Sequence, residues 1–199
     1  MLVNVAAPVI GYLLGAIPSA YVMGKWRKGI DIREVGVGNM GAGNVIREVG
    51  LMEGAVVAAA DIGKGAAAIA VAQYLLGVPQ AWVLGAGLAA IIGHSFPIYI
   101  GFRGGQGVAT VIGIFSVLAP LATLMTLLPL GAVLLISRNI FASTLVMGPL
   151  LPLVVWLVEG STVLTLYALG IVILLVFRSR HRLGEARAVV PKGRQHGLR

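Results

Sequence analysis

The 199-residue chain contains no cysteine and few charged residues. Without cysteine, disulfide bonds, cysteine-ligated iron–sulfur clusters and thiol chemistry are all excluded. Charged residues make up 11% of the chain, whereas a soluble domain carries about 25%. Hydrophobic residues make up 58%, and the mean hydropathy is +0.97. This composition excludes a water-soluble domain and is typical of an integral membrane protein.

Acidic residues are the scarcer charged class, with 7 Asp and Glu against 15 Lys and Arg, which gives a net charge of +8. A basic chain can bind nucleic acid, but these basic residues flank apolar segments, which argues against that class. They lie within 25–47, at Arg103, at Arg138 and within 178–199, and Lys64 is the one basic residue inside an apolar run. By the positive-inside rule, we expect all four clusters to face the cytoplasm.

The apolar segments predict how the chain crosses the membrane. Because Arg103 and Arg138 should lie on one side, the apolar stretch 107–136 between them must cross twice or not at all. Pro120 and Pro129 offer places to turn, so we expect two short helices there. The other apolar segments have about the length of a membrane-spanning helix; they lie near 3–24, 54–77, 80–100, 142–158 and 161–177.

These segments together predict an all-α, polytopic membrane bundle of about seven transmembrane helices, with the N-terminus outside and the C-terminus cytoplasmic. The expected outer turns, at 77–80, 119–120 and 159–160, carry no basic residue. The N-terminal segment lacks a positively charged start and a small-residue cleavage site, so we expect a retained helix. We expect one domain over residues 1–183 and a basic cytoplasmic tail over 184–199.

Two glycine-rich stretches lie on the predicted cytoplasmic side. The first reads GVGNMGAGNVIR at 36–47. Glycine allows successive backbone N–H groups to turn toward an anion, while Asn39, Asn44 and Arg47 add donors that suit phosphate. The second reads FRGGQGVAT at 102–110 and is preceded by GHSFPIY at 93–99. Each stretch is either an anion-binding loop or a plain surface loop, and His94 is either a core residue or a proton acceptor.

Charged residues also occur within and beyond the apolar segments. Asp61 and Lys64, in DIGKG at 61–65, are three residues apart and share a helix face,. Two interpretations are open: Asp61 and Lys64 form a structural ion pair, or Lys64 contacts a substrate anion. In SRNIFAS at 137–143 and RSRHRLGEAR at 178–187, the basic residues set the topology or bind anionic lipid,. His181 and Glu185 lack a third ligand within sequence reach, so we predict no metal site.

The order of these four blocks resembles the bacterial acyl-phosphate:glycerol-3-phosphate acyltransferases, from about residue 10 to about residue 183. The family pattern is close to G-S-G-N-x-G-A-T-N, then D-x-x-K-G, then G-H-x-F-P followed by F-K-G-G-K-G-V-A-T. The third block is the most specific, because it keeps a long set of pattern residues together; they include His94, Phe96, Pro97, Phe102, Gly104, Gly105, Gly107, Val108, Ala109 and Thr110.

The resemblance implies a seven-helix enzyme of the bacterial cytoplasmic (inner) membrane that makes lysophosphatidic acid for phospholipid biosynthesis. It would transfer a fatty acyl group from acyl phosphate to the 1-hydroxyl of glycerol 3-phosphate, with no covalent acyl-enzyme and no cofactor. Phosphate is a good leaving group, so positioning and electrostatic stabilisation would carry the rate. Membrane lipids and other membrane proteins are the further partners to expect.

The residues that carry these roles follow from the motif positions. His94 or a substrate phosphate oxygen would take the proton, and Asn39 and Asn44 would donate to the developing oxyanion. Asp61 would form the structural ion pair. The remaining positions would bind substrate; they are Gly38, Gly41, Arg47, Lys64, Arg103, Gly104, Gly105, Gly107, Arg138, Ser143 and His181.

The chain departs from the family pattern at several polar positions. Val37 and Gly43 stand where the family has serine and threonine, and Gln106 stands where it has a second lysine. The C-terminal block RHRLGEAR lacks the family's asparagine. These departures leave open a divergent enzyme with an altered acceptor, and a catalytically impaired relative that binds lipid or serves as an accessory subunit. A third alternative is a small transporter of phosphorylated solutes, with Asp61 and Lys64 as its pathway residues. Against transport, the sequence shows no inverted second half.

Overall fold

The computed structural model describes residues 1–137 and 140–188, and the described part contains helices and no strands. Each apolar run forms a helix because a backbone in lipid must satisfy its own hydrogen bonds. The helices are α1 (Leu2–Gly15), α2 (Ser19–Lys28), α3 (Ala42–Glu48), α4 (Leu51–Ala70, extended by a π-helical turn Val71–Leu75), α5 (Gln80–Ser95), α6 (Val108–Leu118), α7 (Pro120–Ser137), α8 (Ile140–Glu159) and α9 (Thr162–Ala188).

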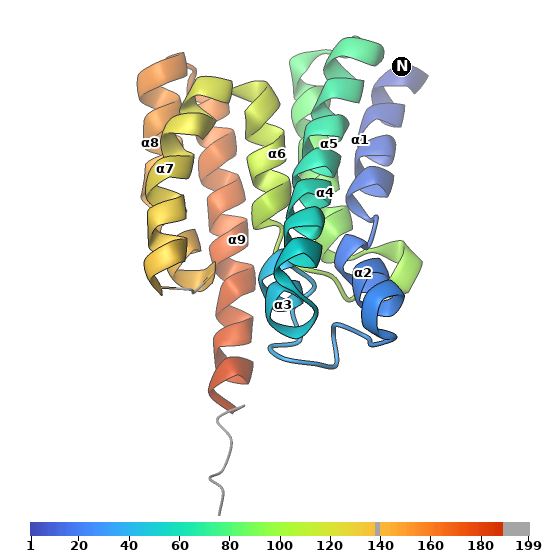
Figure 1. Ribbon diagram of the computed structural model, residues 1–199. Coiled ribbons are helices and arrows are strands. Elements are labelled where there is room, and N and C mark those ends of the chain that lie inside the picture. Colours follow the sequence, from blue (N-terminus) through green and yellow to red (C-terminus); the bar gives the residue numbers. More distant parts are fainter. Residues whose placement is uncertain (138–139, 189–199) are drawn as a thin grey trace, which may run out of the picture.

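The long helices run alternately up and down in one bundle (Figure 1). Stretch 107–136 does form two helices, α6 and α7, that meet at Ala119–Pro120, as the parity of the basic residues predicts. Within the described part of the chain, three helical segments are long and apolar enough to span a bilayer, and shorter apolar stretches lie in α6, α7, α8 and α9. The residues after α1, between α5 and α6, and at the end of α9 lie at one end of the bundle, opposite the N-terminus (Figure 1). That this end faces the cytoplasm stays a prediction.

The apolar segment predicted near 3–24 lies within one candidate membrane span, Leu2–Lys28, but this span is not one continuous helix. α1 ends at Gly15 and α2 begins at Ser19. Pro18 lacks an N–H group and disfavours helical geometry at the residue before it, so the helix breaks at Ala16–Pro18. The predicted loop 36–47 also contains α3.

Small residues bring the helices into backbone contact. A Cβ atom on Gly11 or Gly15 of α1 would overlap the backbone of Ala86 or Ala90 of α5. Gly65 of α4 and Gly113 of α6 pack in the same way against each other's helix. Such close approach is how helices associate in lipid. As a result, α1 packs closely against α5, and α4 packs closely against α6.

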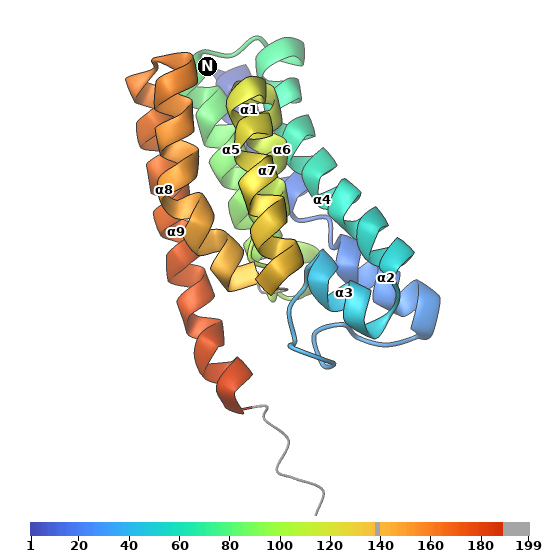
Figure 2. The ribbon, with the colours of Figure 1, turned by 60° about the vertical axis from the view of Figure 1, so that its left-hand side comes forward.

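A second, smaller apolar core lies beneath the first glycine-rich stretch. It contains Ile32, Met40, Val45 and Val57, all at most 4% exposed. Figure 2 shows α2 and α3 beside one end of α4, on the side of the bundle away from α8. The chain between α2 and α3 is therefore attached to the bundle by its own core.

Candidate functional site

The first glycine-rich stretch, 36–47, forms the end of a loop and then α3. We call residues 30–41, which connect α2 to α3, the first glycine-rich loop. Gly36 and Gly38 have φ values of 59° and 64°, which favour glycine,. Asn44, 2% exposed, holds the loop from α3: its Nδ2 donates to the carbonyls of Ile32 (2.9 Å) and Val35 (3.1 Å), and its Oδ1 accepts from the N–H of Val37 (3.1 Å). Both amide hydrogens of Asn44 are thus used inside the loop.

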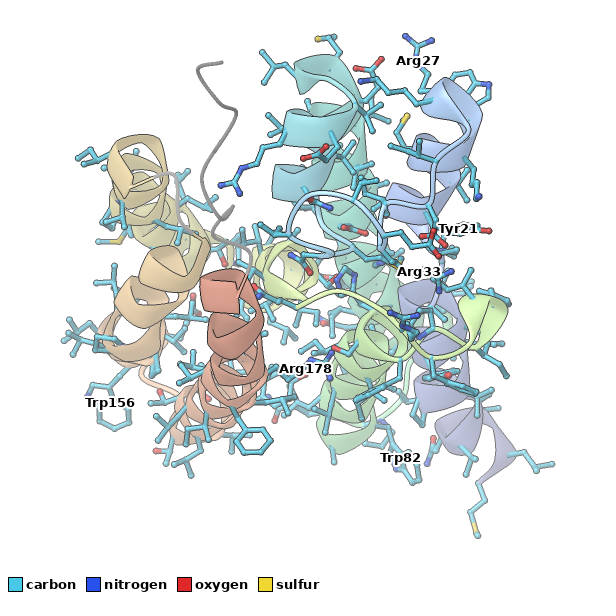
Figure 3. The ribbon with its side chains drawn as sticks, turned by 90° about the horizontal axis from the view of Figure 1, so that it is seen from below. Tyr21, Arg27, Arg33, Trp82, Trp156 and Arg178 are labelled. Carbon is cyan, nitrogen blue, oxygen red and sulfur yellow. The ribbon has the colours of Figure 1, made fainter. Side chains whose placement is uncertain are left out.

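An arginine links this loop to the second one. Arg33 bonds the Asp31 carboxylate through Nε (2.9 Å) and Nη2 (2.7 Å), and its Nη1 donates to the carbonyl of Ile100 (2.8 Å). The hydrogen bond from Arg33 lowers the pKa of Asp31 to about 2, and the same contact raises the pKa of Arg33,. The Arg33 guanidinium also lies 5.1 Å from the centre of the Tyr21 ring, and Figure 3 shows these two side chains close together.

The second glycine-rich loop, residues 101–107, follows α5 and ends at the first turn of α6. The N–H groups of Gly104 and Gly105 donate to the carbonyls of Ser95 and His94, both at 3.1 Å. A Cβ on Gly105 would overlap the His94 ring and lie 2.6 Å from the carbonyl oxygen of Met40. Because Met40 belongs to the first loop, the two glycine-rich loops touch at Gly105.

Three charged or ionisable side chains from α4 and α5 form a buried cluster behind these loops. Asp61, Lys64 and His94 are 1%, 7% and 6% exposed. The Asp61 carboxylate lies 2.8 Å from Lys64 Nζ and 3.7 Å from His94 Nδ1, and it accepts a hydrogen bond from Ser19 Oγ at 2.6 Å. Lys64 also donates to the carbonyl of Ile17 at 3.0 Å. The break before Pro18 releases this carbonyl from helical bonding, so the helix break and the ion pair depend on each other.

Several buried polar atoms around the loops have no hydrogen-bond partner among the described residues. They are Asn39 Oδ1, His94 Nδ1, Ser95 Oγ, Gln106 Oε1, Thr110 Oγ1 and Arg178 Nε. An unpaired polar atom in a protein interior costs about 1–3 kcal/mol, so such atoms are rare and gather at functional sites. The first N–H groups of α6, from Val108 onward, point out of its N-terminus and add donors for an anion.

The structure brings most of the predicted site residues to this end of the bundle. Gly38 lies in the first loop, Gly41 precedes α3, and Gly104, Gly105 and Gly107 form the second loop. Arg47 in α3 and Arg103 in the second loop are exposed. Arg138 lies outside the described residues. Ser143 and His181 belong to α8 and α9, but their side chains lie outside the described part of the chain.

Sequence reasoning missed three residues of this site. Ser19 bonds Asp61, Arg33 joins the two loops, and Arg178 of α9 donates from Nη2 to the carbonyl of Gly105 at 3.2 Å. Figure 3 shows Arg178 extending inward from α9. Arg33 and Arg178 belong to basic clusters that the sequence explains by topology alone. The spacing D-x-R of Asp31 and Arg33 was a usable signal, because it favours a local ion pair.

A family profile described as glycerol-3-phosphate acyltransferase matches residues 5–188 of the chain. Among curated proteins, the chain is 41% identical over 167 residues to "Glycerol-3-phosphate acyltransferase 1" of Dehalococcoides mccartyi, which covers 79% of this chain and 78% of the relative. It is 39% identical over 174 residues to "Glycerol-3-phosphate acyltransferase" of Parasynechococcus marenigrum, with 87% and 82% covered.

Two solved structures share the fold. The first is the glycerol 3-phosphate form of PlsY (YgiH), an integral membrane glycerol 3-phosphate acyltransferase, with a TM-score of 0.83, 30% identity and coverage of 98% of this chain and 96% of that chain. The second is the lysophosphatidic acid form of the same enzyme, with a TM-score of 0.81, 29% identity and coverage of 93% and 92%.

Proposed function

Because the chain belongs to the glycerol-3-phosphate acyltransferase family, we propose that it transfers a fatty acyl group from acyl phosphate to glycerol 3-phosphate. The product is lysophosphatidic acid, which one of the two similar solved structures contains. The 1-hydroxyl oxygen attacks the acyl carbon, the bond from that carbon to the phosphate oxygen breaks, and inorganic phosphate leaves. The hydroxyl proton passes to a phosphate oxygen or to His94.

The observation that carries this proposal is the contact between the two glycine-rich loops at Gly105 and Met40. The two substrates each carry a phosphate, and the acyl carbon of one must meet the hydroxyl of the other. Two adjacent glycine-rich loops can hold two phosphates side by side, because their backbones can approach an anion closely. Both loops lie at the end of an apolar bundle, where a phosphate group can stay in water while an alkyl chain stays in lipid.

The geometry separates the roles of the two asparagines. Asn44 uses both amide hydrogens within the first loop, so we assign it to shaping that loop. Asn39, 7% exposed, has a buried Oδ1 without a partner among the described residues. We therefore assign to Asn39 the polar contact with substrate. The N–H groups of Gly38, Gly104 and Gly105 donate to the carbonyls of Val35, Ser95 and His94, so we assign these three glycines to shaping the loops. We assign the backbone N–H groups of Gly41 and Gly107 to the phosphates.

We also divide the basic residues into some that bind phosphate and some that have a structural role. Arg47 and Arg103 are exposed at the loops and suit phosphate by their planar fork,. Lys64 contacts Asp61 and Ile17, which favours a structural role over direct substrate contact. His94 has its Nδ1 toward Asp61 and its Nε2 toward Gly105, so it lies between the ion pair and the second loop. Arg138, Ser143 and His181 remain candidates for substrate binding.

We place this enzyme in the bacterial cytoplasmic membrane, with the glycine-rich end facing the cytoplasm and its soluble substrate. The positive-inside rule supports this orientation, because the basic residues 25–33 and Arg103 lie at that end,. Acyl phosphate would reach the loops from the bilayer, since its chain is membrane-soluble.

The test is product formation by the purified protein in lipid. We would incubate it with palmitoyl phosphate and glycerol 3-phosphate and look for lysophosphatidic acid by mass spectrometry. Asn39→Ala is the control, because the structure assigns Asn39 no bond that the fold needs. Product from the parent that is lost in Asn39→Ala supports the proposal. No product from a folded parent would refute it and point to the non-catalytic alternative, which the departures at Val37, Gly43 and Gln106 favour.

A further inference from the structure

A short turn with exposed apolar side chains, residues 97–102, lies between α5 and the glycines of the second loop. The N–H groups of Ile100 and Phe102 both donate to the carbonyl of Pro97, at 3.3 and 2.9 Å. From the first loop, Arg33 Nη1 donates to the carbonyl of Ile100 at 2.8 Å. This apolar turn is therefore closed on itself and attached to the first loop.

Three large side chains of the apolar turn are exposed. Ile98, Tyr99 and Phe102 are 50%, 55% and 55% exposed. Phe102 has a φ of 61°, in the left-handed region that a bulky residue rarely adopts, and Gly101 before it has a φ of 75°,. Phe102 thus holds a backbone conformation suited to glycine while much of its ring stays outside the protein. Packing within the protein does not offset that cost, which points to a contact outside it.

The apolar turn lies at the end of a membrane span. The span that contains α5 runs from Gln80 to Ile100. The 16 residues of α5 rise about 24 Å along the helix axis, whereas the hydrocarbon core of a bilayer is about 30 Å thick. Figure 1 and Figure 3 both show the chain after α5 at the outer edge of the bundle, beside α2. The turn therefore reaches the boundary between hydrocarbon and lipid headgroups.

The side chains at this edge match that boundary. Tyrosine combines an apolar ring with a polar hydroxyl group, which is typical of the membrane interface. Lys25 of α2 is exposed, and Lys25 and Arg33 lie 5.9 and 5.1 Å from the centre of the Tyr21 ring. Positive charge therefore lies close to the apolar side chains, and it is complementary to the anionic headgroups that cover the hydrocarbon chains.

We propose that the side chains of Ile98, Tyr99 and Phe102 insert into the bilayer interface and set the depth of the second glycine-rich loop in the membrane. Gly104 is two residues after Phe102, so the glycines of the loop follow the depth of the turn. The consequence for the reaction rests on the proposed function, in which acyl phosphate reaches the loop from the bilayer and glycerol 3-phosphate reaches it from water. The depth of the loop should then matter more for the lipid-borne donor.

The first experiment measures the depth of the turn without using activity. Because the chain contains no cysteine, a spin label on one introduced cysteine reports a single position. We would label Tyr99→Cys in lipid nanodiscs and measure its collisions with oxygen, which enters lipid, and with a water-soluble nickel chelate. Glu34→Cys, at an exposed position of the first loop, is the aqueous control. Leu88→Cys, 40% exposed on α5, is the lipid control.

The label at Tyr99 should behave like the lipid control. We expect it to lose most of the nickel collisions that the Glu34 label shows, and to collide with oxygen more often than the Glu34 label does. A Tyr99 label as accessible to the nickel chelate as the Glu34 label would overturn the insertion, and would leave a second protein as the partner of the turn.

The second experiment measures the effect of the turn on each substrate. Phe102→Gly removes the ring, and glycine suits a φ of 61°, so the turn can keep its shape,. Tyr99→Ser gives the same test if Phe102→Gly does not fold. Tyr74→Ser is the matched control, because Tyr74 is 69% exposed on the π-helical turn that follows α4, at the opposite end of the bundle.

Loss of one inserted aromatic ring should raise KM for palmitoyl phosphate roughly 3- to 10-fold and leave KM for glycerol 3-phosphate within about 2-fold of the parent. Tyr74→Ser should match the parent. Equal rises in the two KM values, or no rise in either, would overturn the role of the turn in setting the depth of the loop.

The insertion and the proposed function fail separately. A parent that gives no product, with a Tyr99 label that lies in lipid, refutes catalysis and supports the insertion. A parent that gives product, with a Tyr99 label that lies in water, supports catalysis and refutes the insertion.

Discussion

The two glycine-rich loops have similar compositions but are held in different ways. The first loop is fastened by its own neighbours in sequence: Asn44 bonds three of its backbone groups, and Asp31 pairs with Arg33. The second loop is fastened from a distance, by the backbone and ring of His94 in α5 and by Arg178 in α9. The first loop can therefore keep its shape locally, whereas the second depends on how the helices pack.

This difference shows how a flexible-looking sequence can form a defined site. Glycine lowers the cost of unusual backbone angles but adds no contacts of its own, so order has to come from partners. The loops then meet at Gly105 and Met40, and Arg33 bonds the carbonyl of Ile100 just before the second loop. A substitution in either loop, or in the Asp61–Lys64 ion pair behind them, should therefore disturb the conformation of one loop more than that of the other.

The largest effect is expected from Asp61→Asn. It leaves the Lys64 charge buried without its carboxylate, and breaking such a pair costs roughly 3–5 kcal/mol. It also removes the carboxylate charge that faces His94 Nδ1. Because His94 holds the second loop, that loop should become more mobile while the first loop keeps its shape. Thermal unfolding followed by tryptophan fluorescence measures the loss. The double variant Asp61→Asn with Lys64→Met should recover much of it, and a single variant as stable as the parent would contradict the role of the pair.

Gly105→Ala tests the contact between the loops directly. The new Cβ would overlap the His94 ring and press on the Met40 carbonyl, so the loops must move apart. A displacement of about 1 Å in a catalytic site can reduce the rate roughly 100-fold, and we expect a loss of that size in lysophosphatidic acid formation. Gly63→Ala is the control, because a Cβ there would meet no described atom within 4 Å outside its own helical turn. Equal activity of the two variants would rule out the contact as a positioning element.

Asn44→Ala should weaken the first loop and leave the second intact. The carbonyls of Ile32 and Val35 lose their side-chain donor, at about 1–3 kcal/mol for a buried group left unpaired. Stability and product formation should therefore both fall. Asn39→Ala is the matched comparison, since it should reduce product formation with a smaller loss of stability than Asn44→Ala, whose side chain holds three backbone groups. If both variants lose stability equally, the division of roles between the two asparagines is incorrect.

Much of this arrangement can be predicted from the sequence. Apolar runs and basic residues predict the helices, including the pair α6 and α7, because lipid imposes a strict length and charge pattern. The glycine loops and His94 are visible because their residue types are unusual beside a membrane helix. Contacts between distant segments were not predictable. Nothing in the spacing of Arg178 shows that it reaches Gly105, and the bond from Lys64 to Ile17 depends on a helix break that hydropathy does not reveal.

The smallest effect concerns pH and the link between the loops. Hydrogen bonding to Arg33 lowers the pKa of Asp31 from 3.8 to about 2 in the folded protein. Because the folded-state pKa is the lower one, the pair stabilises the fold fully above pH 3.8 and loses this contribution as the pH falls toward 2. Parent and Asp31→Asn should therefore differ in unfolding temperature at pH 5–7 and converge at low pH, and Arg33→Gln should remove the same pH dependence. A difference in unfolding temperature that stays constant with pH would show that Asp31 stabilises the first loop by packing. The charge of Asp31 would then have no part in linking the first loop, through Arg33 and the Ile100 carbonyl, to the second loop.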